Sequence, residues 1–247
     1  MKRFIILVYG ISCYIIGMLS FVFIISLLFG WKFTAMAVPS EHFTLQHISI
    51  NIGLLLLFSV QHSFMAHKTY KTRANISPAV ERSTYVLSSG ILLILISFCW
   101  QPLPGKIWML DDSSPLALLL LILESLGWLL TVISTFLISH TDLFGLRQSW
   151  MQWQRKSYTQ LPFKLNFFYS LCRHPMMSGL LLAFWATPNM TSSRLLFASG
   201  MTVYILIGIY FEEKGLQQEL GKPYREYCQS TPKLIPKNFN RRKNSGS

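Results

Sequence analysis

The sequence predicts an all-α, polytopic membrane protein with five to six hydrophobic segments, a C-terminal helical hairpin and cytoplasmic C-terminal helices. Of its 247 residues, 51% are hydrophobic and only 13% are charged, and the mean hydropathy is +0.40. Soluble proteins carry about 25% charged residues, so this composition indicates an integral membrane protein. Apolar runs that approach or exceed the roughly 20 residues needed to cross a bilayer occur at residues 4–30, 48–66, 84–100 and 115–139. We expect residues 1–247 to form one membrane-embedded domain.

The first apolar run is too long for the core of a secretory signal peptide, which has roughly 7–15 apolar residues. The stretch Ala35-Met36-Ala37 resembles a cleavage site, but the length of the run favours a retained membrane span. Within it, Gly10 and Gly17 are small enough to let a second helix approach closely.

The distribution of basic residues predicts how the chain is oriented in the membrane. The formal net charge is +12, yet only Lys32, Lys106 and Arg194 fall in one set of alternate loops, and the other 19 of 22 basic residues fall on the opposite side. The positive-inside rule then places both termini of this multi-pass chain in the cytoplasm. The basic tail 237–247 is expected to meet anionic lipid headgroups or water. Basic residues are not interleaved with aromatic residues in a patch, so neither nucleic acid nor an obligate protein partner is expected.

The four cysteines, at positions 13, 99, 172 and 228, have no C-x-x-C spacing. Neither a disulfide framework nor a zinc site is implied, and we expect no metal. Cys172 adjoins Arg173 in sequence, and we interpret it as a bystander thiol.

Polar residues inside the first four segments leave two questions open. Gln61-His62-Ser63 lies near the cytoplasmic end of the second segment, where it could form interhelical hydrogen bonds or bind a ligand. Glu124 lies within the fourth segment and must face the interior of the bundle, in a structural or a functional role. His140 follows that segment, and a short helix with Trp150 and Trp153 is then expected to lie on the membrane surface.

The last third of the chain brings charged residues together. Arg173 and His174 stand directly before Pro175, which opens an apolar arm at 176–187. A turn at 188–189 and a return arm at 195–211 would carry the next two residues, both glutamates, back beside Arg173 and His174. Gly221 is suited to end the second helix, and Tyr224 and Tyr227 share a face of the helix that follows.

A cytoplasmic pocket lined by arginine, histidine, two carboxylates and aromatic rings suits a ligand of mixed charge such as S-adenosylmethionine. Its carboxylate would pair with Arg173 or His174, its amino and ribose groups with glutamate, and its sulfonium with aromatic faces. The alternative is that Arg173 forms a juxtamembrane ion pair with Glu212 or Glu213 that only closes the hairpin. None of the fourteen glycines forms a G-x-G pair, so the usual dinucleotide fold is not expected.

The C-terminal motifs resemble the isoprenylcysteine carboxyl methyltransferase superfamily of membrane methyltransferases. They are Arg-His-Pro-x-x-x-Gly at 173–179, Glu-Glu at 212–213, Leu-Gly-x-x-Tyr-x-x-Tyr at 220–227 and a closing Pro236. Further segments resemble the bacterial methanethiol S-methyltransferase (nurim-like) branch, namely Gln61-His62-Ser63, 81–85, 140–148, 158–163 and 183–188. The resemblance covers roughly residues 45–236.

The resemblance implies a cofactor site for S-adenosylmethionine within residues 173–236. Carried over by position, the binding residues are Tyr169, His174, Pro175, Met176, Met177 and Glu212, with Glu213 beside them. Relatives in the wider superfamily commonly have an aromatic residue at the position of Met177, whose thioether can still pack against adenine.

The activity that the resemblance implies is methyl transfer to a small thiol, most directly methanethiol, giving dimethyl sulfide. A thiol with a pKa of about 8.5 or higher is mostly protonated at pH 7, so a cation or base is needed near the sulfur. Arg173 is the candidate cation, and His140 or His62 the candidate base. An apolar tunnel between the hairpin and segments 84–100 and 115–139 is expected to admit the thiol, with Gly179 beside it. The alternatives are an isoprenylcysteine carboxyl or other lipid or thiol methyltransferase, and a non-catalytic membrane scaffold.

Overall fold

The computed structural model describes residues 1–30, 44–67, 70, 75–159, 161 and 167–235. Its elements are α1 (Lys2–Leu28), α2 (Leu45–Ala66), α4 (Pro78–Cys99), β1 (Lys106–Met109), α5 (Pro115–Ile138), α6 (His140–Leu143), α7 (Leu146–Trp153), α8 (Phe167–Leu171), α9 (Pro175–Trp185), β2 (Asn189–Thr191), α10 (Ser192–Leu220) and α11 (Lys222–Ser230). The closing Pro236 and the basic tail 237–247 lie outside the described residues.

Within the described residues, five helices are long and apolar enough to cross a membrane: α1, α2, α4, α5 and α10. The prediction of a polytopic helical protein is confirmed, and the chain is a multi-pass membrane protein. The hairpin arm α9 has 11 residues, which span about 16 Å at 1.5 Å per residue. It is therefore too short to cross a bilayer core of about 30 Å by itself.

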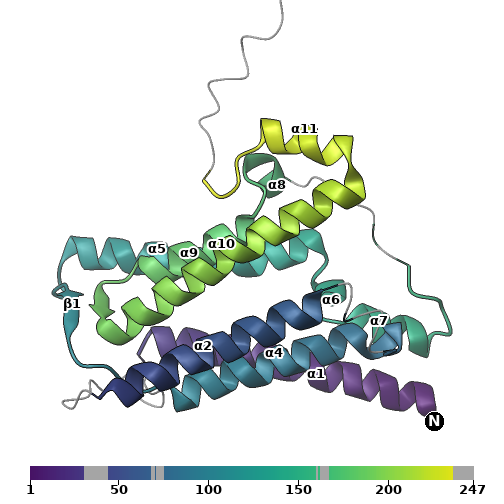
Figure 1. Ribbon diagram of the computed structural model, residues 1–247, viewed down its shortest axis with the longest axis horizontal. Helices are drawn as coiled ribbons and strands as arrows, with labels where there is room; N and C mark the ends of the chain where they lie inside the picture. The colour runs from purple at the N-terminus through teal and green to yellow at the C-terminus, as the bar shows by residue number, and fades with distance from the viewer. Residues whose placement is uncertain (31–43, 68–69, 71–74, 160, 162–166, 236–247) are drawn as a thin grey trace, which may run out of the picture.

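The helices form two groups (Figure 1). In one group α4 packs against α1 and α2, and α7 packs against α1 and α4; in the other α9 packs against α5 and α10. Helix α10 also contacts α2 and so connects the groups. Helices α8 and α11 lie together at one end of α10, beside its C-terminus (Figure 1).

Serine, threonine and proline begin several of the long helices. Pro78 and Pro115 stand in the first turns of α4 and α5, where the preceding serine accepts a backbone N–H bond. Gly221 ends α10 with a φ of +66°, as its predicted role as a cap requires.

Small residues set the close contact between α1 and α4. A Cβ added to Gly90 on α4 would lie 3.4 Å from the Cα of Gly17, and one added to Gly17 would lie 2.6 Å from Val86. The predicted packing role of the small residues in the first segment is confirmed.

A short two-stranded sheet, which the sequence did not predict, covers the turn of the hairpin. Strand β1 pairs antiparallel with β2, and the indole of Trp108 donates to the backbone oxygen of Thr187 at 2.9 Å. These contacts connect the loop after α4 to the loop between α9 and α10.

Glu124 lies in a buried ion pair with Arg194. The two side chains are 1% and 5% exposed, and Arg194 Nη2 lies 2.8 Å from Glu124 Oε1. Arg194 also donates to the backbone oxygens of Leu28 and Ala183, so this one side chain connects α10 to α1, α5 and α9. The predicted position of Arg194 in an external loop is wrong, because the residue lies in the first turn of α10 with its charge compensated by Glu124.

Replacing Glu124 by leucine should lower the melting temperature of the detergent-purified protein. Removing one partner of a buried ion pair leaves an uncompensated charge and costs about 3–5 kcal/mol. The double variant Glu124→Leu/Arg194→Met, which removes both charges, should melt closer to the wild type. A double variant that melts below Glu124→Leu would contradict this account.

The contact between α5 and α9 depends on two glycines. A Cβ added to Gly179 would lie 2.6 Å from Thr131 Oγ1 and 2.7 Å from the backbone oxygen of Gly127. The expected apolar tunnel therefore does not run along this contact, because backbone atoms fill it. Gly179 is a packing residue, and its replacement tests helix contact rather than substrate entry.

Gly179→Ala should destabilise the protein by about 1–3 kcal/mol, the usual cost of overpacking. The matched control is Gly208→Ala on α10, where an added Cβ meets nothing within 4 Å. Thermal unfolding in detergent should separate the two variants, and equal melting temperatures would show that α5 can move away from α9 without loss.

Candidate functional site

The carboxylate of Glu213 is the centre of a buried charge cluster beside α8. Its Oε1 accepts from Arg173 Nε at 2.7 Å and lies 3.1 Å from His174 Nε2, while Oε2 lies 3.3 Å from Lys233 Nζ. The Glu213 side chain is 7% exposed. The ion pair that the sequence left as an alternative is therefore present, and Glu213 is the glutamate that forms it.

Arg173 is engaged by this cluster and by the C-terminal segment. Besides Glu213, its Nη1 donates to the backbone oxygens of Cys228, at 2.8 Å, and Thr231. Three of the five guanidinium N–H donors are thus used inside the protein. The side chain connects the start of α9 to α10 and α11.

Residues 231–234 lie along the Arg-His-Pro motif. The backbone N–H groups of Arg173 and His174 donate to the oxygens of Pro232 and Lys233 at 2.9 and 3.0 Å. The hydroxyl of Ser178 donates to the oxygen of Leu234 at 2.7 Å. We call residues 231–234 the C-terminal strap.

Tyr169 of α8 and Tyr227 of α11 connect these short helices. The Tyr227 hydroxyl donates to the backbone oxygen of Tyr169 at 2.5 Å. Burial raises the pKa of Tyr227 to about 12, and burial together with the carboxylate of Glu212 raises the pKa of Tyr169. Both phenols are therefore protonated at neutral pH.

Glu212, the neighbour of Glu213, has a different environment. Its side chain is 51% exposed, and its Oε2 lies 3.8 Å from His174 Nδ1, too far for a hydrogen bond. Successive helical residues point in directions about 100° apart, so Glu213 faces the charge cluster while Glu212 faces open space beside Tyr169. Of the two acids, Glu212 is the one whose oxygens can bind a ligand.

The other predicted cofactor residues lie in the first turn of α9. Pro175 is buried at the first position of the helix, and the backbone oxygen of Met176 accepts from Thr131 Oγ1 at 3.5 Å. Met177 packs against the hydrophobic core. These residues hold the start of α9, which follows His174 directly, against α5 and the core.

His62 belongs to a second polar cluster, between α2 and α4. Its Nε2 lies 2.5 Å from the Tyr85 hydroxyl, and its Nδ1 lies 3.1 Å from Ser89 Oγ. The ring of Tyr204, on α10, meets the imidazole edge to face at 6.2 Å. The cluster therefore touches the helix that carries Glu212, and Tyr85 lies within electrostatic range of that carboxylate.

His140 lies in a third place, among α1, α5 and α6. Its Nε2 lies 3.0 Å from the Tyr14 hydroxyl and its Nδ1 lies 2.8 Å from Thr135 Oγ1, while the ring stacks on Phe136 at 4.2 Å. Burial lowers the pKa of His140, so the imidazole is neutral at pH 7. His62 and His140, the two candidate bases from the sequence, therefore lie in different clusters.

Sequence reasoning missed two residues of these clusters. Tyr85 was noted within the motif at 81–85 without a role, and its signal was its position one helical turn from Arg82 and Ser89 on the same stretch. Lys233 was counted only among the 19 basic residues on the cytoplasmic side, and no sequence spacing relates it to Glu213.

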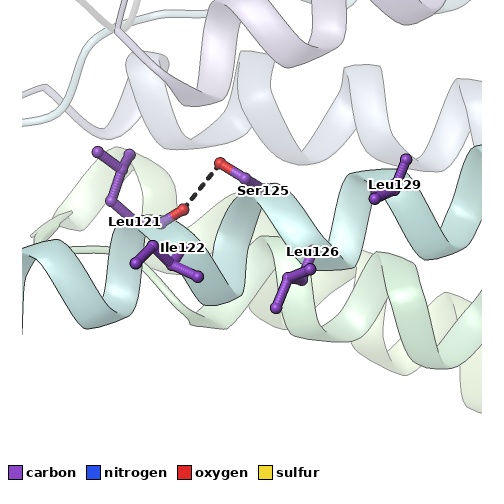
Figure 2. Close-up of a pocket in the computed structure, with 5 residues that line it drawn as sticks. All are labelled: Leu121, Ile122, Ser125, Leu126 and Leu129. Carbon is purple, nitrogen blue, oxygen red and sulfur yellow. Dashed lines mark hydrogen bonds between the residues drawn. The ribbon is translucent and has the colours of Figure 1, made fainter.

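A shallow depression of about 280 Å³ lies on α5, away from all these residues. It is lined by Leu121, Ile122, Ser125, Leu126 and Leu129 (Figure 2). The Ser125 hydroxyl already donates to the backbone oxygen of Leu121 at 2.8 Å (Figure 2). Without a charged side chain, this lipid-facing surface does not suit a charged cofactor.

Known proteins are similar to this chain over almost its whole length. It is 39% identical over 245 residues to a methanethiol S-methyltransferase from Mycobacterium tuberculosis, covering 96% of this chain and 98% of the relative. It is 40% identical over 241 residues to a methanethiol S-methyltransferase from Crocosphaera subtropica, covering 96% and 93%. Nurim from Sus scrofa is more distant, at 29% over 197 residues.

No family model and no solved structure matches the chain. The two bacterial relatives nevertheless match over almost the full length of both sequences. The chain belongs to the methanethiol S-methyltransferase family.

Proposed function

We propose that this protein transfers a methyl group from S-adenosylmethionine to methanethiol, giving dimethyl sulfide and S-adenosylhomocysteine. Residues 1–247 would form a single membrane-embedded methyltransferase domain, with the cofactor bound by 173–236. Family membership supports the reaction, and the open carboxylate of Glu212 beside a fully paired Glu213 is the observation that carries the site.

The described residues fit a cofactor of mixed charge. Glu212 offers carboxylate oxygens to amino or ribose groups, Tyr169 offers a protonated phenol, and Met177 offers a thioether to an adenine ring. His174 Nδ1 lies 3.8 Å from Glu212 Oε2, so one polar group of a ligand beside the two atoms could contact both. When bound, the cofactor supplies an electrophilic methyl group on a positively charged sulfonium.

The Arg173 guanidinium is proposed to hold the site together. The sequence suggested it as the cation beside the substrate sulfur, but its contacts with Glu213, Cys228 and Thr231 commit it to the protein. Of the two histidines, His62 rather than His140 is proposed to be the final acceptor of the thiol proton within the protein, because His62 contacts the helix that carries Glu212.

The cofactor is charged and must arrive from water, whereas methanethiol is small, apolar and soluble in lipid. The charge bias of the loops supports a site at the cytoplasmic face, with both termini cytoplasmic, in a bacterial inner membrane. A site at the end of α10 could then bind the cofactor from the cytoplasm and the thiol from the bilayer.

Purified protein in detergent should produce headspace dimethyl sulfide from methanethiol and S-adenosylmethionine, measured by gas chromatography. Omission of either substrate is the control. If S-adenosylhomocysteine binds by calorimetry but no dimethyl sulfide forms, the acceptor is another thiol or an isoprenylcysteine carboxylate. If the ligand does not bind at all, the protein is a non-catalytic scaffold.

Glu212→Gln should weaken S-adenosylhomocysteine binding about tenfold or more, because a hydrogen bond to a charged group contributes roughly 1.5–3 kcal/mol. Titration calorimetry measures the change. The matched control is Glu226→Gln, which removes a 63%-exposed carboxylate of α11 and should leave the affinity unchanged. Normal affinity with a lowered melting temperature would instead assign Glu212 a purely structural role.

A further inference from the structure

A directional chain of hydrogen bonds ends at the imidazole of His62. The Ser88 hydroxyl donates to the backbone oxygen of Thr84 at 2.9 Å and accepts from Gln61 Nε2 at 2.8 Å. These bonds orient the Gln61 amide, so that its Oε1 accepts from the Ser89 hydroxyl at 3.4 Å. The Gln61 amide is thus oriented with its Nε2 toward Ser88 and its Oε1 toward Ser89.

This chain determines which nitrogen of His62 carries the proton. Because Ser89 donates to Gln61, its oxygen accepts from Nδ1 of His62, 3.1 Å away. Nε2 is then the unprotonated nitrogen, and it accepts from the Tyr85 hydroxyl at 2.5 Å. A phenol that donates to a neutral imidazole is placed to pass its proton on and to take another.

One cation beside Tyr85 offsets part of the cost of negative charge on its buried oxygen at the moment of transfer. The guanidinium of Arg82 lies over the phenol ring, 4.8 Å from its centre, and its Nε is held by the backbone oxygen of Leu143 at 2.7 Å. The other ionisable groups that act on Tyr85 are Tyr204 and Glu212, both on α10. Arg82 is the cation among them.

The position of the pair suits a small apolar thiol. Tyr85 and His62 are half-buried, and the ring of the buried Phe58 lies 5.2 Å from the imidazole. Tyr85 lies within electrostatic range of Glu212, which we assign to the cofactor. An acceptor beside Tyr85 would thus lie between an apolar ring and the cofactor site.

We propose that Tyr85 is a catalytic residue that takes the proton of the thiol substrate and passes its own to His62. This proposal rests on the proposed thiol methyltransferase function. The S–H bond breaks and its proton goes to Tyr85 Oη, while the Tyr85 proton goes to His62 Nε2. The electron pair left on sulfur forms the new S–CH₃ bond, and the electrons of the broken methyl–sulfonium bond stay on the leaving thioether. His62 returns the proton to water.

The test compares wild type with Tyr85→Phe, using methanethiol at a series of pH values from 7 to 9. General base catalysis contributes about 10²–10⁴-fold, so the variant should be about 100-fold slower or worse at pH 7. Without Tyr85 the reaction depends on free thiolate, whose fraction rises about tenfold per pH unit below the thiol pKa. The ratio of wild-type to variant turnover should therefore fall by about tenfold for each pH unit.

Tyr14→Phe is the matched control, because Tyr14 also bonds Nε2 of a histidine, His140, at 3.0 Å. It should keep wild-type turnover and pH dependence. His62→Gln should show the same recovery at high pH as Tyr85→Phe, and both should bind S-adenosylhomocysteine with wild-type affinity by calorimetry, which also excludes misfolding.

A ratio near one at pH 7, or a loss that stays constant from pH 7 to 9, would overturn the role of Tyr85. So would recovery at high pH in Tyr14→Phe but not in Tyr85→Phe. Failure of the proposed function looks different, because the wild type itself would then form no dimethyl sulfide at any pH.

Discussion

The structure of the site depends on one buried carboxylate. Glu213 lies among Arg173, His174 and Lys233, and these contacts join α10 to the start of α9 and to the C-terminal strap. A buried carboxylate is stable only when cations and N–H groups replace its lost hydration. The three partners come from two separate stretches of the chain, so the charge requirement of Glu213 brings those stretches together.

This arrangement gives two adjacent glutamates different environments. The partners of Glu213 use its oxygens, and helical geometry turns Glu212 away from them toward Tyr169. A ligand that bound Glu213 would have to compete with Arg173, whereas a ligand that bound Glu212 would leave the scaffold intact. The same logic applies to Arg173, whose donors hold the C-terminal strap and α11 in place.

The helical architecture could be predicted because it depends on local features of the sequence. These are the lengths of the apolar runs, the prolines that begin helices and Gly221, which ends one. The hairpin that brings the acids to Arg173 and His174 also followed from run lengths. Which acid pairs with Arg173 could not be predicted, since the rotation of α10 depends on its packing against α9. Arg194 was wrongly placed in a loop because hydropathy assigns a charged residue at the end of an apolar run to the loop. In the structure, Glu124 on another helix compensates the charge, so Arg194 can lie within α10. The His62–Tyr85 pair joins two helices whose register no local pattern reveals.

The C-terminal strap determines the order in which the site can be built. Its backbone oxygens at 232 and 233 bind Arg173 and His174, and Thr231 and Lys233 complete the shells of Arg173 and Glu213. Ribosomes make these residues after all five long helices. During insertion the helices therefore enter the membrane before the charge cluster is complete. A nascent chain that stopped short of residue 231 would have these five helices but an incomplete charge cluster.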